Sequence, residues 1–114
     1  MNSEEKTEKE IKEDRLLSAL GLCVRAGGII FGVPMICEAM QSGGKNMPLL
    51  VIEAGDTSEN THKRISDRCG YYKVKHIRTD TGCERLAAAL GKHTPIAAVA
   101  VKDKRFIGLI EKYI

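Results

Sequence analysis

Two runs of apolar residues constrain the fold of this chain more than any other feature of its sequence. LLVIEA covers residues 49–54 and IAAVAV covers residues 96–101, and each run has the usual length of one β-strand. A strand of this composition is typical of a sheet that is covered on both faces. The sequence therefore predicts helices above and below a small sheet.

The segments around these runs carry apolar residues at the spacing of helices. Five helices are expected to begin near Asp14, Pro34, Asp56, Thr81 and Asp103. The third and fourth of these starts have a glutamate three residues later, which is the spacing of a capping box. Ile29–Phe31 and Val74–Arg78 supply two further short strands. The alternating elements predict an α/β fold, namely a three-layer α/β/α sandwich with a small mixed four-stranded sheet.

Length and charge divide the chain into two unequal parts. The 114 residues suit one hydrophobic core. Residues 1–13 alternate in charge without an apolar face, so we expect a frayed lead-in there and a single domain over residues 14–114. Residues 1–15 carry a net charge of −2, and residues 16–114 carry +5. This basic body favours a polyanionic partner.

The sequence gives no sign of a membrane, exported or metal-binding protein. No run reaches the roughly 18 apolar residues of a membrane span, and the first residues lack the apolar core of a signal peptide. We therefore expect a cytoplasmic protein. The cysteines lie far apart on apolar helical stripes, so we expect reduced, buried thiols and no metal site. They are Cys23, Cys37, Cys69 and Cys83.

The motifs of common enzyme classes are missing from the sequence, which has no GxSxG, HExxH or phosphate-loop pattern. His62 and His76 have no acid or nucleophile close by in the sequence pattern, so both are expected at the surface. Helix capping accounts for the polar run Asp56–Ser58. We therefore expect a protein without enzymatic activity and without a cofactor.

The positions of the basic residues favour a binding function. Lys63 and Arg64 fall on the third predicted helix, and Lys92 and His93 lie in the loop GKHTP. Each pair of basic residues alone could simply be part of a solvated charged surface. Together, the two pairs favour binding to the phosphates of RNA. Aromatic residues make up only 4% of the chain, which gives little support for base stacking. An RNA partner would therefore be held mainly through its shape and backbone.

The order of these motifs resembles a known family. RAGGIIFG is followed by a helix that ends at SGG and then by LLVIEAGDTSENTHKRISDRCGYYKV. This order is similar to that of the bacterial YlxQ-like branch of the kink-turn RNA-binding ribosomal protein superfamily, over about Leu16–Ile114 and most specifically over Asp56–Tyr72. The resemblance implies an α/β/α sandwich that binds structured RNA without catalysis. It also implies an rRNA or kink-turn-like partner and an association with the ribosome.

In that family, RNA contacts the glycine and the first turn of the second helix, and also the loop ahead of the last strand. Gly32 matches the glycine, and Lys92–Pro95 matches the loop. Together with the basic residues above, the expected RNA-binding residues are Arg25, Gly27, Gly28, Gly32, Val33, Pro34, Lys63, Arg64, Lys92, His93 and Thr94.

The chain departs from the family pattern at the positions that read the RNA. Relatives typically place Asn and Glu two and three residues after the glycine and Lys three further on, where this chain has Pro34, Met35 and Glu38. Relatives also often have Lys at the position of Gly28. Proline and methionine cannot hydrogen-bond base edges, and Glu38 repels phosphate. We therefore expect a degenerate kink-turn motif.

These departures leave a second interpretation open. A chain that kept the scaffold and lost kink-turn binding could serve as a protein-interaction module. The apolar patch Phe31–Met35 would then be its contact surface, since methionine is common on binding surfaces. The sequence does not predict an oligomeric state.

Overall fold

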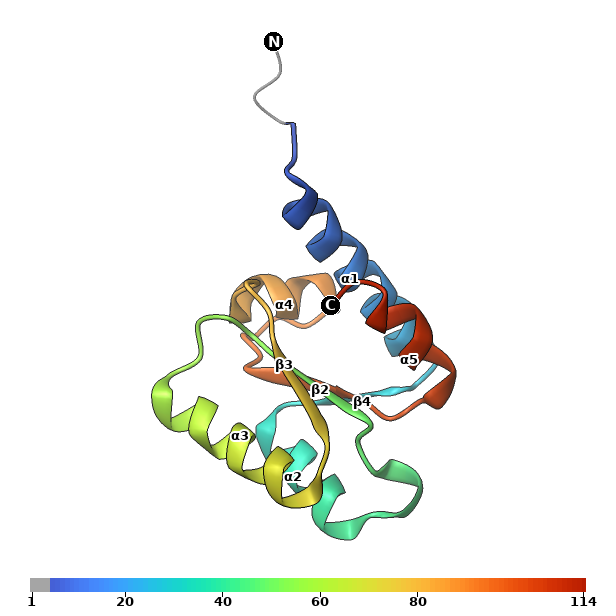
Figure 1. Cartoon of the computed structure of the whole chain (residues 1–114), viewed down its shortest axis with the longest axis vertical. Coiled ribbons are helices and arrows are strands. Elements are labelled where there is room, and N and C mark those ends of the chain that lie inside the picture. The colour runs from blue at the N-terminus through green and yellow to red at the C-terminus, as the bar shows by residue number, and fades with distance from the viewer. Residues whose placement is uncertain (1–4) are drawn as a thin grey trace.

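A mixed sheet lies at the centre of the computed structural model, which describes residues 5–114 (Figure 1). Its helices are α1 (Glu8–Arg25), α2 (Val33–Ser42), the short 3₁₀ helix η1 (Gly44–Asn46), α3 (Glu59–Tyr72), α4 (Cys83–Ala89) and α5 (Lys104–Glu111). Its strands are β1 (Ile29–Phe31), β2 (Leu50–Glu53), β3 (Lys75–Arg78) and β4 (Ala98–Val101).

The four strands lie in the order β1-β4-β2-β3. β2 and β3 are parallel, whereas β4 runs antiparallel to both of its neighbours, β1 and β2. Every residue of the two central strands is buried, while the edge strands are partly exposed. The two apolar runs of the sequence thus contain the two central strands, and their complete burial is what their composition predicts.

Helices cover both faces of this sheet (Figure 1). On one face α1, α4 and α5 enclose a core that contains Leu20 and Ile52, and on the other α2 and α3 enclose a core that contains Ile36 and Val51. The predicted three-layer α/β/α sandwich with a mixed four-stranded sheet is confirmed. No helix within residues 5–114 combines the length and the apolar character that crossing a membrane requires.

The helix start predicted near Asp14 is wrong, because α1 already begins at Glu8. Thr7 and Glu10 form a capping box that satisfies the first free N–H groups of the helix. The ion pair of Asp14 with Arg85 then ties this first part of α1 to α4. Much of the expected lead-in is thus helical, and residues 1–4 lie outside the described residues.

The starts predicted for the third and fourth helices are also corrected. The side chain of Ser58, not of Asp56, caps α3 by accepting the N–H of Thr61 over 3.2 Å. Thr81 is buried and precedes the cap position of α4. Asp56 instead accepts the N–H of Cys83 over 2.8 Å, so it caps α4 from 27 positions earlier in the chain.

Candidate nucleic-acid interface

The turn between β1 and α2 is built on Gly32. Its φ of 86° is in the region that glycine adopts most readily, and its N–H donates to the carbonyl of Ala98 over 3.0 Å. Its own carbonyl accepts the N–H of Ile36, which closes the first turn of α2. The turn therefore fixes the start of α2 beside the end of the sheet.

The first turn of α2 presents backbone and apolar side chains to solvent. Val33 is buried, whereas Pro34 is exposed and the Met35 side chain is 55% exposed. No side chain caps this helix among the described residues. A helix start without a cap leaves N–H groups free to meet an anion, although Pro34 has none to offer. Of the apolar patch Phe31–Met35, Pro34 and Met35 form the exposed part.

The loop that follows α4 lies against this turn. The Lys92 ammonium sits 4.2 Å from the centre of the Phe31 ring, which is a cation–π contact. His93 and Thr94 follow in the same exposed loop. The structure thus brings together two of the segments that the sequence predicted to contact RNA, although about sixty positions separate them.

A second group of predicted residues lies at the opposite end of β1. Arg25 and Gly27 are exposed, and the carbonyl of Gly28 accepts the N–H of Lys102 over 2.9 Å. Gly28 itself is buried, and a Cβ there would lie 2.6 Å from the Cβ of Asp103. Packing against the start of α5 therefore leaves no room for a side chain at this position.

Lys63 and Arg64 lie on α3, in the same layer as α2. Both side chains are exposed, while Ile65 and Cys69 of the same helix pack into the core that α2 shares. Within residues 5–114, neither basic side chain takes part in an ion pair. α3 thus adds two exposed cationic side chains to this layer of the molecule, on a helix that also carries Glu59 and Asp67.

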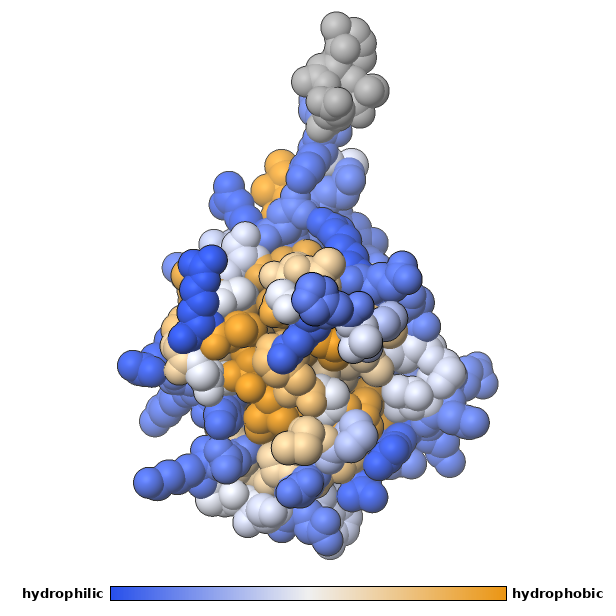
Figure 2. Space-filling view, turned by 180° about the vertical axis from the view of Figure 1, so that it is seen from behind, coloured by the Kyte–Doolittle hydropathy of each residue, from blue (hydrophilic) through white to orange (hydrophobic). Residues whose placement is uncertain are grey.

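A hollow of about 390 Å³ runs along the outer edge of β1. It is lined partly by apolar residues, including Ile30, Phe31 and Met35, and partly by the polar residues Glu38, Ser42, Asn46 and Lys102. Figure 2, which views the molecule from behind Figure 1, shows hydrophobic residues gathered at the middle of the face and hydrophilic residues around them. This surface is large enough to receive an apolar group from another molecule.

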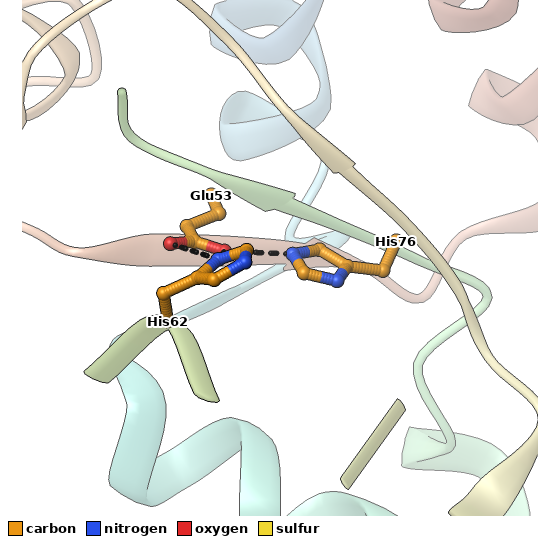
Figure 3. Close-up of side chains that lie close together, drawn as sticks. All are labelled: Glu53, His62 and His76. Carbon is orange, nitrogen blue, oxygen red and sulfur yellow. Dashed lines mark hydrogen bonds and ion pairs between the residues drawn. The ribbon is translucent and has the colours of Figure 1, made fainter. Parts of the chain in front are cut away.

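The structure corrects the expectation that His62 and His76 are unrelated surface residues. Both rings contact the carboxylate of Glu53, the last residue of β2, over 2.8 Å (Figure 3). Glu53 is fully buried. The sequence pattern did not reveal this cluster, because its members come from three elements and share no motif.

The comparisons with known proteins match most of the chain to one family. Residues 14–109 match the family described as ribosomal protein L7Ae/L30e/S12e/Gadd45. A Bacillus subtilis protein named RNA-binding protein YlxQ is 31% identical over 87 residues, which are 76% of this chain and 82% of that protein. An Enterococcus faecium protein of the same name is 33% identical over 66 residues, which are 57% of this chain and 60% of that protein.

Solved structures agree at the level of the fold. A Bacillus halodurans protein of unknown function superposes with a TM-score of 0.76 at 30% identity, over 87% of this chain and 95% of that one. A 15.5 kD RNA-binding protein of Giardia lamblia superposes with a TM-score of 0.69 at 15% identity, over 96% of this chain and 87% of that one. The chain therefore belongs to the ribosomal protein L7Ae/L30e/S12e/Gadd45 family, and within it is similar to the YlxQ proteins.

Proposed function

We propose that this protein binds structured RNA and has no catalytic activity. The observation that carries the proposal is the contact of Lys92 with Phe31, because it joins the exposed loop after α4 to the Gly32 turn in one surface. Membership of the family and the names of the YlxQ relatives support the same function. The proposed partner is an element of rRNA. This partner is consistent with the cytoplasmic location expected from the sequence and with the proposed association with the ribosome.

Free N–H groups at the start of α2 and the ammonium of Lys92 would contact phosphates in this mode of binding. Lys63 and Arg64 would add attraction from α3. Arg25, Gly27 and Gly28 lie at the other end of β1. They would contact the RNA only if it extended beyond the Gly32 turn along the length of the strand. Binding would thus depend on the shape and charge of the RNA.

Reading of individual bases would be weak in this protein. The exposed side chains of Pro34 and Met35 cannot donate or accept hydrogen bonds at base edges. The exposed carboxylate of Glu38, one turn further on, repels phosphate. We therefore propose that the preference for a kink-turn over other folded RNAs is small.

A filter-binding titration tests both parts of the proposal. The full chain is titrated with a kink-turn RNA and with a straight duplex of the same length and composition, at several salt concentrations. We expect binding that weakens steeply with salt and favours the kink-turn by less than about tenfold. Binding that is independent of salt would contradict the electrostatic mode, and no binding to either RNA at low salt would contradict the function.

The hollow along β1 favours a second candidate function, which is a contact with another protein. Met35 is exposed at this hollow, and within residues 5–114 no strand pairs with the outer side of β1. Met35→Lys would place a charge in such an interface. Analytical ultracentrifugation that finds a monomer, together with an unchanged set of captured partners for Met35→Lys, would contradict this candidate.

A further inference from the structure

We propose that Glu53, His62 and His76 form a binding site for a divalent transition-metal ion, with Zn²⁺ as the expected ion. The three residues come from the end of β2, the first turns of α3 and the middle of β3. One ligand atom from each lies within 4.8 Å of the others. Figure 3 shows both imidazole rings turned toward the same carboxylate. His62 directly precedes Lys63 and Arg64 on α3, so the site adjoins this part of the surface proposed to bind RNA, although the two share no residue.

The donor atoms suit a borderline metal ion. Two imidazole nitrogens and one carboxylate oxygen are a ligand set that zinc enzymes use, with a fourth position left for water. His62 Nδ1 lies 2.8 Å from Glu53 Oε1, and His76 Nε2 lies 2.8 Å from the same oxygen. Since two nitrogen ligands disfavour Mg²⁺ and Ca²⁺, the site should select against both.

The second oxygen of the carboxylate is already held by other groups. Glu53 Oε2 accepts the hydroxyl of Thr57 and lies 3.5 Å from Nε of Arg78. Arg78 in turn donates to the carbonyl and the hydroxyl of Thr57. His62 Nδ1 also lies 3.0 Å from Oε2, whereas His76 contacts Oε1. The contacts of Thr57 and Arg78 orient Glu53 so that Oε1 faces both histidines, as outer groups commonly orient a metal ligand. Because the positive charge of Arg78 repels a metal cation, we expect the affinity for Zn²⁺ to be lower than that of a site with four protein ligands.

The site can open by the small amount that an ion requires. Donors around a tetrahedral Zn²⁺ ion lie about 3.4 Å apart, compared with the 2.8 Å found here. Glu53 is fixed in the buried strand β2, but the side chain of His62 is 41% exposed and can move outward. The same exposure gives an ion and its water ligand access from solvent. Without a bound ion, a ring N–H can donate to the carboxylate of Glu53. When an ion binds, the proton of a neutral ring moves to the other ring nitrogen, so that the nitrogen facing Glu53 offers its lone pair to the ion.

Three of the four cysteines hold their protons too tightly to compete readily at this site. Burial raises the pKa of Cys69 and of Cys83 to about 11, so both stay protonated at neutral pH. Cys23 is raised to about 11 by burial as well. Thiolate ligation would also give a distinct charge-transfer absorption with Co²⁺, which makes it easy to detect.

Isothermal titration calorimetry with Zn²⁺ tests the proposal on the untagged full chain after removal of metal by a chelator. We expect one equivalent to bind, and His62→Gln to weaken binding at least about tenfold. His76→Gln should do the same. His93→Gln is the matched control, because His93 is the remaining histidine of the chain and lies in an exposed loop. It should bind Zn²⁺ as the wild type does.

Co²⁺ gives an independent measurement of the ligands. We expect the visible absorption of a four- or five-coordinate site without a thiolate band, and the loss of that absorption in His62→Gln. Circular dichroism verifies that His62→Gln, a change at a half-buried position, leaves the protein folded. Failure of the wild type to bind one equivalent, equal binding by His62→Gln, or a thiolate band would each overturn the proposal and leave the cluster as a hydrogen-bond network.

Discussion

The Nε2 atom of His76 and the Oε1 atom of Glu53 lie 2.8 Å apart across the parallel strands β3 and β2. His76 is paired with Val51, so the two side chains are diagonal neighbours on one face of the sheet. Burial alone would raise the pKa of Glu53. Hydrogen bonds from Thr57, His62 and His76 outweigh burial and hold this pKa below its usual value of 4.5.

This lowered pKa makes stability depend on pH. The stabilisation from ionised Glu53 is complete above about pH 4.5 and is lost as the pH falls through the lower pKa of the folded state. At neutral pH we expect Glu53→Gln to lower the free energy of unfolding by about 1–3 kcal/mol, because it removes a charge that three donors satisfy. The difference from wild type should narrow as the pH falls below about 4.5.

Urea unfolding at a series of pH values, in buffer with a chelator, measures this difference. Glu38→Gln is the control, since Glu38 is exposed on α2 and should change stability by less than about 0.5 kcal/mol. A difference for Glu53→Gln that stays constant down to acid pH would show that Glu53 is not ionised in the folded protein.

Gly28 should tolerate no side chain. A Cβ would lie 2.6 Å from Cβ of Asp103 and 2.8 Å from Sγ of Cys23, so Gly28→Ala should destabilise the protein by about 1–3 kcal/mol. Gly21→Ala is the matched control, because Gly21 lies inside α1 with open space around it. That change should stabilise by about 0.5–1 kcal/mol. Thermal unfolding measures the stability of both variants. Equal changes in stability would contradict the conclusion that close packing excludes a side chain at Gly28.

Lys92 should contribute one phosphate contact to RNA binding. Lys92→Ala is expected to weaken binding to every structured RNA by a similar factor and to reduce the slope of log K against log salt by about 1. Lys112→Ala removes the same charge at the end of α5 and should leave the slope unchanged. A change confined to one RNA sequence would instead indicate that Lys92 reads a base.

Kink-turn recognition should be recoverable by restoring the missing polar groups. Pro34, Met35 and Glu38 are all exposed, so the variant Pro34→Asn/Met35→Glu/Glu38→Lys should fold without loss of core packing. Its preference for a kink-turn over a duplex should rise about tenfold or more, since each good base contact contributes about 1–3 kcal/mol.

Glu38→Lys alone is the control for this gain, because it changes charge without adding a group that reads bases. It should strengthen binding to both RNAs equally. The same filter-binding titration compares the triple variant with Glu38→Lys. If both variants prefer the kink-turn over the duplex to the same degree, the backbone geometry of the site, and not only its side chains, has diverged from that of kink-turn binders.

Asp56 should stabilise α4 through the N–H of Cys83. Hydrogen bonds from Cys83 hold the pKa of Asp56 below its usual value of 3.8, so the cap stays charged at neutral pH. Asp56→Ala should cost about 1 kcal/mol in thermal unfolding, and Asp56→Asn, which keeps the acceptor oxygen, should cost less. Equal losses would indicate that the charge matters more than the hydrogen bond.

The sequence by itself determined the elements and their arrangement in layers. The apolar runs at 49–54 and 96–101 predicted two buried strands, and apolar residues at helical spacing in the other segments predicted the helices. These features are local, because periodicity and burial on two faces appear directly in neighbouring residues. The family resemblance followed from the same local motifs and is confirmed by the match over residues 14–109.

Only the tertiary structure decided which side chains meet. β4 lies between β1 and β2, and this strand order brings the end of β2 and the Gly32 turn to opposite sides of Ala98. The contact of Lys92 with Phe31 follows from β4 lying beside β1, whereas the cluster around Glu53 follows from the register of β2 with β3 and from the packing of α3 on the sheet. Such contacts join residues far apart in the chain, so no spacing in the sequence could predict them.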